Sequence, residues 1–326
     1  MMRTFRRWWL TGFLISAAIS VNAETPPLEM GDPIRVPGTK KRFDYLEVDK
    51  SLHRLLADHT ENGTLDVIDL PDGKLRKSVP TGAAQGVAVD TERNRYYVTV
   101  SDKKSLAVID RQSLEVVGEV PLPGAPDSLA YNPKNGLVYV GHDDGNDVWV
   151  IDPAARKVVA TIDIPTAPEY VVYDPVSDRV YQNIKSTPVM VVIDPSTNKK
   201  TETWPTEPAQ KPHGLAIDSE TKRLFAAGGN GTLAVLDANS GKVLSSVDIV
   251  PGVDQIAFDA GNKRIYCASG RAGLSVLEET DHGVKSLGNI ATPAGAHTVA
   301  VDPATHAVWI AYAKEDDAFI ARLSVR

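Results

Sequence analysis

DPAARKVVATIDIPTAPEYVVYDPVSDRVYQNIKSTPVMVVID, residues Asp152–Asp194, spans one full period of a unit that recurs along the chain. An apolar run ends in an acid at Asp174, a polar turn follows, a Val/Tyr-rich run comes next, and another apolar run ends in Ile-Asp. Because a repeat of this length determines the architecture of a chain, its period is the first property to establish.

Two markers measure the period. The residue that ends the first apolar run is an acid, or once its amide, and recurs every 41 to 44 residues: Asp49, Asp90, Asn132, Asp174, Asp218, Asp259 and Asp302. The acid that ends the third apolar run recurs with nearly the same spacing: Asp69, Asp110, Asp152, Asp194, Asp237 and Glu278. Each complete unit holds four short β-rich runs separated by polar turns, and no segment shows helical periodicity.

Units of about 40 residues with four strands each are typical of β-propeller blades. Seven first markers therefore predict an all-β, seven-bladed β-propeller, formed as a single domain by residues 24–326. The last unit, from His297, has only three runs, and the segment 33–38 (PIRVPG) resembles the fourth run of another unit, 247–252 (VDIVPG). We expect this N-terminal strand to complete the last blade and to close the ring.

Residues 1–23 have the pattern of a cleavable signal peptide. Three arginines precede an apolar run over 8–21, and Val-Asn-Ala at 21–23 forms a small-x-Ala cleavage site. The pattern predicts export to the periplasm or secretion. Arg6-Arg7, followed by aromatic residues and a leucine, also fits a twin-arginine signal, but paired basic residues are common in ordinary secretory signals, so the secretory route is favoured. No later apolar run is long enough to span a membrane.

Charge and cysteine content narrow the function classes. Without the three arginines of the signal, 32 of the 35 basic residues remain against 42 acidic ones, a net charge of −10. An acidic chain is a poor partner for nucleic acid. The single cysteine, Cys267, excludes an intramolecular disulfide and is expected to be a buried, unreactive thiol. Trp204, in the proline-rich segment 203–212, is expected to be partly exposed.

Several short motifs resemble the YVTN-repeat, YncE-like periplasmic propellers. They are Tyr-Val-Thr at 97–99, the Pro-Gly-Ala-Pro and Thr-Ala-Pro linkers, and the Val-Ile-Asp and Leu-Ala-Tyr-Asn-Pro patterns. The resemblance covers nearly all of the chain after the signal and implies the propeller fold. It implies no single function, because such propellers include proteins of unknown role, a reported DNA binder and, more distantly, lyases and lactonases. No catalytic motif of those proteins can be matched here.

One register of the repeat points to a site. The residue five positions before each first marker is polar in all seven units and is followed by apolar residues. In a propeller this position begins the innermost strand, so the seven residues should form a ring around the mouth of the channel. The ring consists of Asp44, Gln85, Asp127, Glu169, His213, Asp254 and His297.

Part of this ring has the composition of a metal site. Its two imidazoles and two of its carboxylates come from blades that become neighbours once the propeller closes, and such donors suit a divalent transition metal. His59, ten residues after its marker, is expected on the same face and could complete the coordination shell. The predicted ligands are His213, Asp254, His297, Asp44 and His59. The alternative is a structural girdle whose polar groups hydrogen-bond neighbouring loops.

The other polar residues of this face are candidates for ligand binding. They are the ring members Asp44, Gln85, Asp127 and Glu169 with the loop cations Lys185 and Arg271. The cations could attract an anionic ligand. Glu169 and His142, which also lies ten residues after its marker, are candidates for a catalytic base. The leading hypothesis is a propeller that binds a small molecule or a periplasmic protein at the channel mouth; a metal-dependent lyase or hydrolase is the alternative, and DNA binding is the least favoured.

Overall fold

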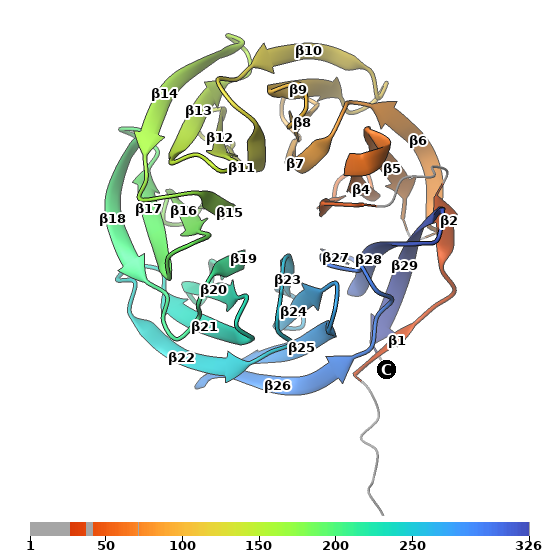
Figure 1. Cartoon of the computed structure of the whole chain (residues 1–326), viewed down its shortest axis with the longest axis vertical. Helices are drawn as coiled ribbons and strands as arrows, with labels where there is room; N and C mark the ends of the chain where they lie inside the picture. Colours follow the sequence, from red (N-terminus) through yellow and green to blue (C-terminus); the bar gives the residue numbers. More distant parts are fainter. Residues whose placement is uncertain (1–26, 37–41, 71, 326) are drawn as a thin grey trace, which may run out of the picture.

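The computed structural model describes residues 27–36, 42–70 and 72–325. Within these residues the chain forms seven antiparallel sheets, arranged as blades around a central axis (Figure 1). The architecture is the seven-bladed β-propeller that the repeat predicts. The described residues contain no α-helix, only a 3-10 turn at Thr60–Asn62. None of their helical segments has the length and apolar character needed to cross a membrane. The predicted signal, residues 1–23, lies outside the described residues.

Strand bounds follow the repeat. Blade one consists of β3 (Tyr45–Asp49), β4 (Arg54–His59), β5 (Thr64–Asp69) and β6 (Lys74–Pro80). Blade two consists of β7 (Ala84–Asp90), β8 (Arg95–Val100), β9 (Ser105–Asp110) and β10 (Val116–Pro121). Blade three consists of β11 (Pro126–Asn132), β12 (Leu137–His142), β13 (Asp147–Asp152) and β14 (Lys157–Asp163). Blade four consists of β15 (Pro168–Asp174), β16 (Arg179–Ile184), β17 (Val189–Asp194) and β18 (Lys199–Pro205). Blade five consists of β19 (Pro212–Asp218), β20 (Arg223–Gly228), β21 (Thr232–Asp237) and β22 (Val243–Asp248). Blade six consists of β23 (Ile256–Asp259), β24 (Arg264–Ser269), β25 (Gly273–Thr280) and β26 (Gly283–Ile290). Blade seven contains β27 (Thr298–Asp302), β28 (Ala307–Lys314) and β29 (Asp317–Val325).

The marker residues cap the turns that follow the strands. Each first marker is the last residue of an innermost strand, and Asp49, for example, accepts hydrogen bonds from the backbone N–H groups of Ser51 and Leu52 at 3.1 Å. Asp and Asn favour such turns because their short side chains bond the backbone two or three residues ahead. Four residues after each first marker the backbone φ is positive, at His53, Asn94, Gly136, Asp178, Lys222, Lys263 and His306. The periodic acid is therefore a signature of one recurring turn.

The core lies between blades. The second and third strands of a blade are packed on both faces, so β8 is buried at every position except its first and β9 at every position except its last. The outermost strands, such as β14, alternate between exposed and more buried positions. Each apolar cluster joins two neighbouring blades; one, for instance, contains Leu65 of blade one and Tyr96 of blade two. This packing explains why the inner strands are apolar at successive positions.

The N-terminal segment closes the ring. β2 (Ile34–Val36) pairs with β29, with Ile34 opposite Ile320, as predicted from the resemblance of 33–38 to a fourth strand. A second short strand, β1 (Leu28–Met30), pairs with the other end of β29, and no sequence pattern predicted it. Figure 1 shows both strands along the outer edge of blade seven.

Two expectations about single side chains have opposite outcomes. Cys267 is fully buried, as expected, and burial raises the pKa of its thiol. The expectation for Trp204 was wrong, because this side chain is 5% exposed and packs against Tyr181, with ring centroids 5.8 Å apart. A Cβ at Gly241 would lie 2.1 Å from the indole, so the glycine leaves space for it.

Candidate functional site

The seven ring residues begin the innermost strands, as the register predicts. Gln85, Asp127, Glu169 and His213 are second in β7, β11, β15 and β19; Asp44 and His297 directly precede β3 and β27; and Asp254 lies two residues before β23.

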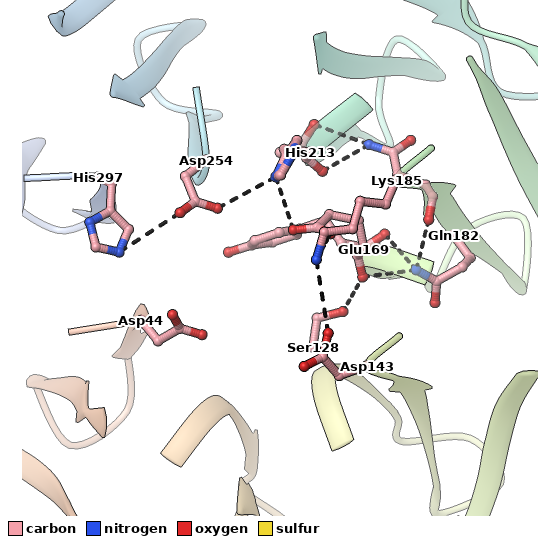
Figure 2. A network of polar contacts seen from close by, with 12 residues as sticks. Asp44, Ser128, Asp143, Glu169, Gln182, Lys185, His213, Asp254 and His297 are labelled. Carbon is pink, nitrogen blue, oxygen red and sulfur yellow. Dashed lines mark hydrogen bonds and ion pairs between the residues drawn. The ribbon is translucent and has the colours of Figure 1, made fainter. Parts of the chain in front are cut away.

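Side chains of blades three and four hold the backbone of this ring in place. Gln182 Nε2 donates a hydrogen bond to the carbonyl of Glu169 at 2.9 Å, and Asn183 Nδ2 donates one to the carbonyl of His213 at 3.0 Å. The hydroxyl of Ser128 also donates to the carbonyl of Glu169. These contacts, drawn in Figure 2, connect blades three, four and five at the mouth. They fix the strand starts from which the functional side chains project.

The ring surrounds a polar cavity of about 240 Å³. Five ring members line it, together with residues of neighbouring loops and strands: Arg42, Asp44, Tyr45, Gln85, Asp127, Ser128, Asp143, Asp144, Glu169, Tyr170, Lys185 and Asp254. The rings of Tyr45 and Tyr170 stack with centroids 5.5 Å apart. Both tyrosines also line hollows among the middle residues of the inner strands, so they form the floor between the mouth and the rest of the channel.

Carboxyl groups dominate this cavity. Six of its lining residues are Asp or Glu, and two, Arg42 and Lys185, are cations. Burial raises the pKa of Asp44 to about 6, against the opposing effect of Arg42, which donates a hydrogen bond to it. Burial also raises the pKa of Asp127 well above its usual value, and the charge of Glu169 adds to the effect. The lining therefore holds more acid than its own cations can neutralise.

Three potential metal ligands meet on one side of the cavity. His213 Nδ1 lies 2.9 Å from Glu169 Oε1 and 3.8 Å from Asp254 Oδ1. One donor atom from each residue lies within 4.8 Å of the others. The carboxylates of Asp254 and Glu169 raise the pKa of His213 to about 10. Figure 2 shows the imidazole pointing between the two acids.

His297 approaches the same carboxylate from the other side. Its Nε2 lies 3.8 Å from Asp254 Oδ2, and its Nδ1 is 2.7 Å from the carbonyl of Gly295. The carbonyl can only accept, so Nδ1 carries the proton. Burial raises the pKa of Asp254, but His213, His297 and Arg42 outweigh it and leave the pKa below its usual value. Asp254 is therefore an ionised carboxylate between two histidines (Figure 2).

Two of the predicted metal ligands lie apart from this cluster. His59 is fully buried, with its Nδ1 2.9 Å from Asp66 Oδ2 and its ring stacked on Phe43 at 4.1 Å. As the last residue of β4, it points into the packing layer of blade one and not toward Asp254. Asp44 lines the cavity, but it contacts Arg42 and is not part of the three-residue cluster. Glu169, which was predicted to bind ligand or to act as a base, takes the place of both.

The remaining candidates are spread over the mouth. His142 is not among the residues that line the cavity, since its Nδ1 bonds Asp147 at 2.6 Å and its ring packs against Trp149. Gln85 lines the cavity and donates a hydrogen bond to Ser101 Oγ at 2.8 Å. Arg271 lines an adjoining hollow of about 380 Å³, which shares Arg42 and Asp254 with the first.

Some lining residues were not predicted, although the repeat contains a signal for them. Asp143 lies 11 residues after its marker, which is the register of Lys185 in the next blade. Tyr45 and Tyr170 directly follow ring members. Extending the comparison of registers beyond one position would have found all three.

The comparisons with known proteins agree on the fold. A chain in the structure of hydrazine synthase from Kuenenia stuttgartiensis has a TM-score of 0.74 at 14% identity, covering 90% of this chain and 98% of that one. A chain in the crystal structure of a mitotic checkpoint complex has a TM-score of 0.76 at 14% identity, covering 98% of both. At this identity the likeness concerns the fold alone. Among curated proteins no match to this sequence is found.

A family comparison is more specific. Residues 48–178, which span most of blades one to three and the first strand of blade four, match the family model of the YNCE-like beta-propeller. Together with the seven-bladed ring, this match supports placing the chain in a YncE-like β-propeller family.

Proposed function

We propose that this propeller binds a small, positively charged molecule in the cavity at its channel mouth. The observation that carries the proposal is the excess of six carboxyl groups over two cations around a space of about 240 Å³. Crowded, buried acids retain protons, and a bound cation would relieve their mutual repulsion. Asp127, whose pKa is raised well above its usual value by burial and then by neighbouring acids such as Glu169, is the residue expected to gain most from the ligand. The expectation of an anionic ligand, based on Lys185 and Arg271, is less compatible with this lining.

The size of the cavity limits the ligand. Pockets for drug-sized molecules are commonly about 300–1,000 Å³. A cavity of about 240 Å³ therefore suits a compact amine better than a large molecule or a folded protein segment. The stacked rings of Tyr45 and Tyr170 would contact its apolar part, and a cation over their faces would gain further attraction.

Calorimetric titration of metal-free protein in EDTA tests the proposal. The probes are putrescine, the neutral butane-1,4-diol and the dianion succinate, which have similar length but different charge. We expect putrescine to bind, the other two not to bind, and Asp127→Asn to weaken putrescine binding at least tenfold. Asp281→Asn, at an exposed turn outside the mouth, is the matched control. Equal binding of the diol, or an unchanged affinity in Asp127→Asn, would overturn the proposal.

Export is part of the proposal. The basic start, apolar run and Val-Asn-Ala site within residues 1–23 support removal of a signal before Glu24 and a periplasmic or secreted location. The intact mass of the protein recovered from the periplasm tests this. A mass starting at Glu24 is expected, and a mass that includes residues 1–23 in the cytoplasmic fraction would contradict export.

A metal-assisted lyase or hydrolase is a second candidate, favoured by the meeting of Glu169, His213 and Asp254 within 4.8 Å. In such an enzyme the metal would act as a Lewis acid, while Asp127 or Asp44 in the same cavity could exchange protons with the substrate. A screen of esters and lactones, with and without EDTA, separates this candidate from simple binding. DNA binding is the least supported, because an acidic mouth repels phosphate groups.

A further inference from the structure

We propose that the junction of blades four, five and six binds one divalent transition metal ion through Glu169, His213 and Asp254. The inference goes beyond the proposed ligand cavity, with which it shares Glu169 and Asp254. It also differs from the set that the sequence indicates, because it includes Glu169 and omits Asp44, His59 and His297.

The distances suit a small metal ion. Metal–nitrogen and metal–oxygen bonds of about 2.0–2.2 Å in a tetrahedral site place neighbouring ligand atoms roughly 3.3–3.6 Å apart. His213 Nδ1 lies 2.9 Å from Glu169 Oε1 and 3.8 Å from Asp254 Oδ1, on either side of that range. The donor atoms of Glu169 and Asp254 lie within 4.8 Å of each other, so rotations of the two carboxylates would bring all three ligands to bonding distance.

The histidine has an unused position. Its Nδ1 is shielded from solvent but makes no hydrogen bond with any of the described residues, although Glu169 Oε1 is only 2.9 Å away. The close oxygen does not lie where the ring nitrogen could bond it. Buried polar atoms are ordinarily satisfied. An ion between the three side chains would satisfy this nitrogen and both acids together.

The three ligands stand on rigid supports. The carbonyls of Glu169 and His213 are held by Gln182 and Asn183, and the backbone N–H of Asp254 donates to the carbonyl of Ala268 at 3.0 Å. Metal ligands are characteristically oriented by a second group. Here His297 Nε2 lies 3.8 Å from Asp254 Oδ2, and Lys185 Nζ lies 3.3 Å from Glu169 Oε2 (Figure 2). These are the carboxylate oxygens that would not bind the metal.

The donor set indicates the class of metal. An imidazole with two carboxylates suits zinc, iron, cobalt or manganese, whereas magnesium and calcium prefer oxygen ligands alone. The competing explanation is an ion-pair network in which a protonated His213 neutralises the two acids. That network binds no metal, so the two explanations predict different results.

Metal binding by the full chain without its signal tests the inference. After EDTA treatment and removal of the chelator, the protein is titrated with ZnCl2, and bound metal is counted by elemental mass spectrometry after gel filtration. We expect one zinc per chain, and a loss of affinity of at least tenfold in both His213→Gln and Glu169→Gln. His282→Gln, at an exposed turn, is the matched control for adventitious binding by a histidine.

A second readout keeps the test independent of folding defects. Co²⁺ bound to wild type should give visible absorption bands typical of low-coordinate cobalt, and these should be absent from variants that still unfold cooperatively. Binding of less than about 0.1 zinc per chain, zinc binding unaffected by His213→Gln, or magnesium binding as tight as zinc would each overturn the inference. The putrescine titration is made in EDTA, so failure of the metal site leaves that result untouched, and the reverse also holds.

Discussion

His213 has two carboxylates as neighbours, and its charge can be predicted in the metal-free protein. Asp254 and Glu169 raise its pKa to about 10, so the imidazole should stay protonated across neutral pH. A raised folded-state pKa means that the stabilising effect is complete below about pH 6.5 and is lost as the pH rises through 10. We expect nitrogen-detected NMR spectra in EDTA to show one histidine that titrates near pH 10 and is missing in His213→Gln. A histidine at this position that titrates below pH 7 would contradict the prediction.

Asp44 should make stability depend on pH in the acidic range. Burial raises its pKa from 3.8 to about 6, so its contribution is present below about pH 4 and is lost as the pH rises through 6. A rise of about two pKa units corresponds to a change of roughly 3 kcal/mol in the free energy of unfolding. In Asp44→Asn this part of the pH dependence should disappear. Urea unfolding of both proteins at pH 4 and pH 7 measures it, and identical slopes against pH would contradict the assignment.

At the level of single residues, the sequence could predict where the ring lies but not which of its members meet. The register of the repeat placed all seven polar residues at the mouth. The direction of each side chain depends on contacts between blades, and no repeat pattern contains that information. His59 and His142 share a register, and both were expected to contribute to the site at the mouth. Instead, each contacts a carboxylate of its own blade: His59 contacts Asp66 at 2.9 Å, and His142 contacts Asp147 at 2.6 Å.

Among the elements, the turns that join strands were the most predictable feature. The acid at each strand end was readable from the sequence because its short side chain closes the same turn in every blade. The pairing of β1 with β29 was not predictable, since a three-residue strand without a repeat partner has no periodic signal.

One turn residue also links two blades. Arg111, after β9, forms a buried ion pair with Asp49 at the end of β3, with Nη2 and Oδ2 2.7 Å apart. Removing one partner leaves a charge buried without compensation, which typically costs about 3–5 kcal/mol. Arg111→Met should therefore destabilise the protein by about this amount in urea unfolding, and Asp49→Asn in the same chain should restore part of it. Arg76→Met, which removes an exposed pair with Asp69, should have a far smaller effect. If Arg111→Met and Arg76→Met lowered the free energy of unfolding by similar amounts, the ion pair between blades would contribute little.

Across the whole molecule, fold and site differ in how far the sequence reveals them. Seven copies of one pattern specify the propeller, and structures at 14% identity share it. The mouth is where the copies differ from one another: one register holds acids, an amide and two histidines, while the apolar runs beside it keep their character. Function in such a fold depends on the site and not on the architecture.

Closure of the ring gives a prediction about the whole molecule. Val36 in β2 is 1% exposed and packs in the cluster between blades one and seven, whereas the neighbouring Arg35 points outward toward Asp317. Val36→Ser should lose roughly 2–3 kcal/mol, the value of a fully buried apolar side chain. Because β2 joins the two ends of the ring, we expect the urea midpoint to fall with an unchanged m-value, as for one cooperative unit. Arg35→Ser is the matched control and should leave the midpoint nearly unchanged. A lower m-value, or faster amide exchange restricted to β29, would instead show that blade seven opens alone while the other six remain folded.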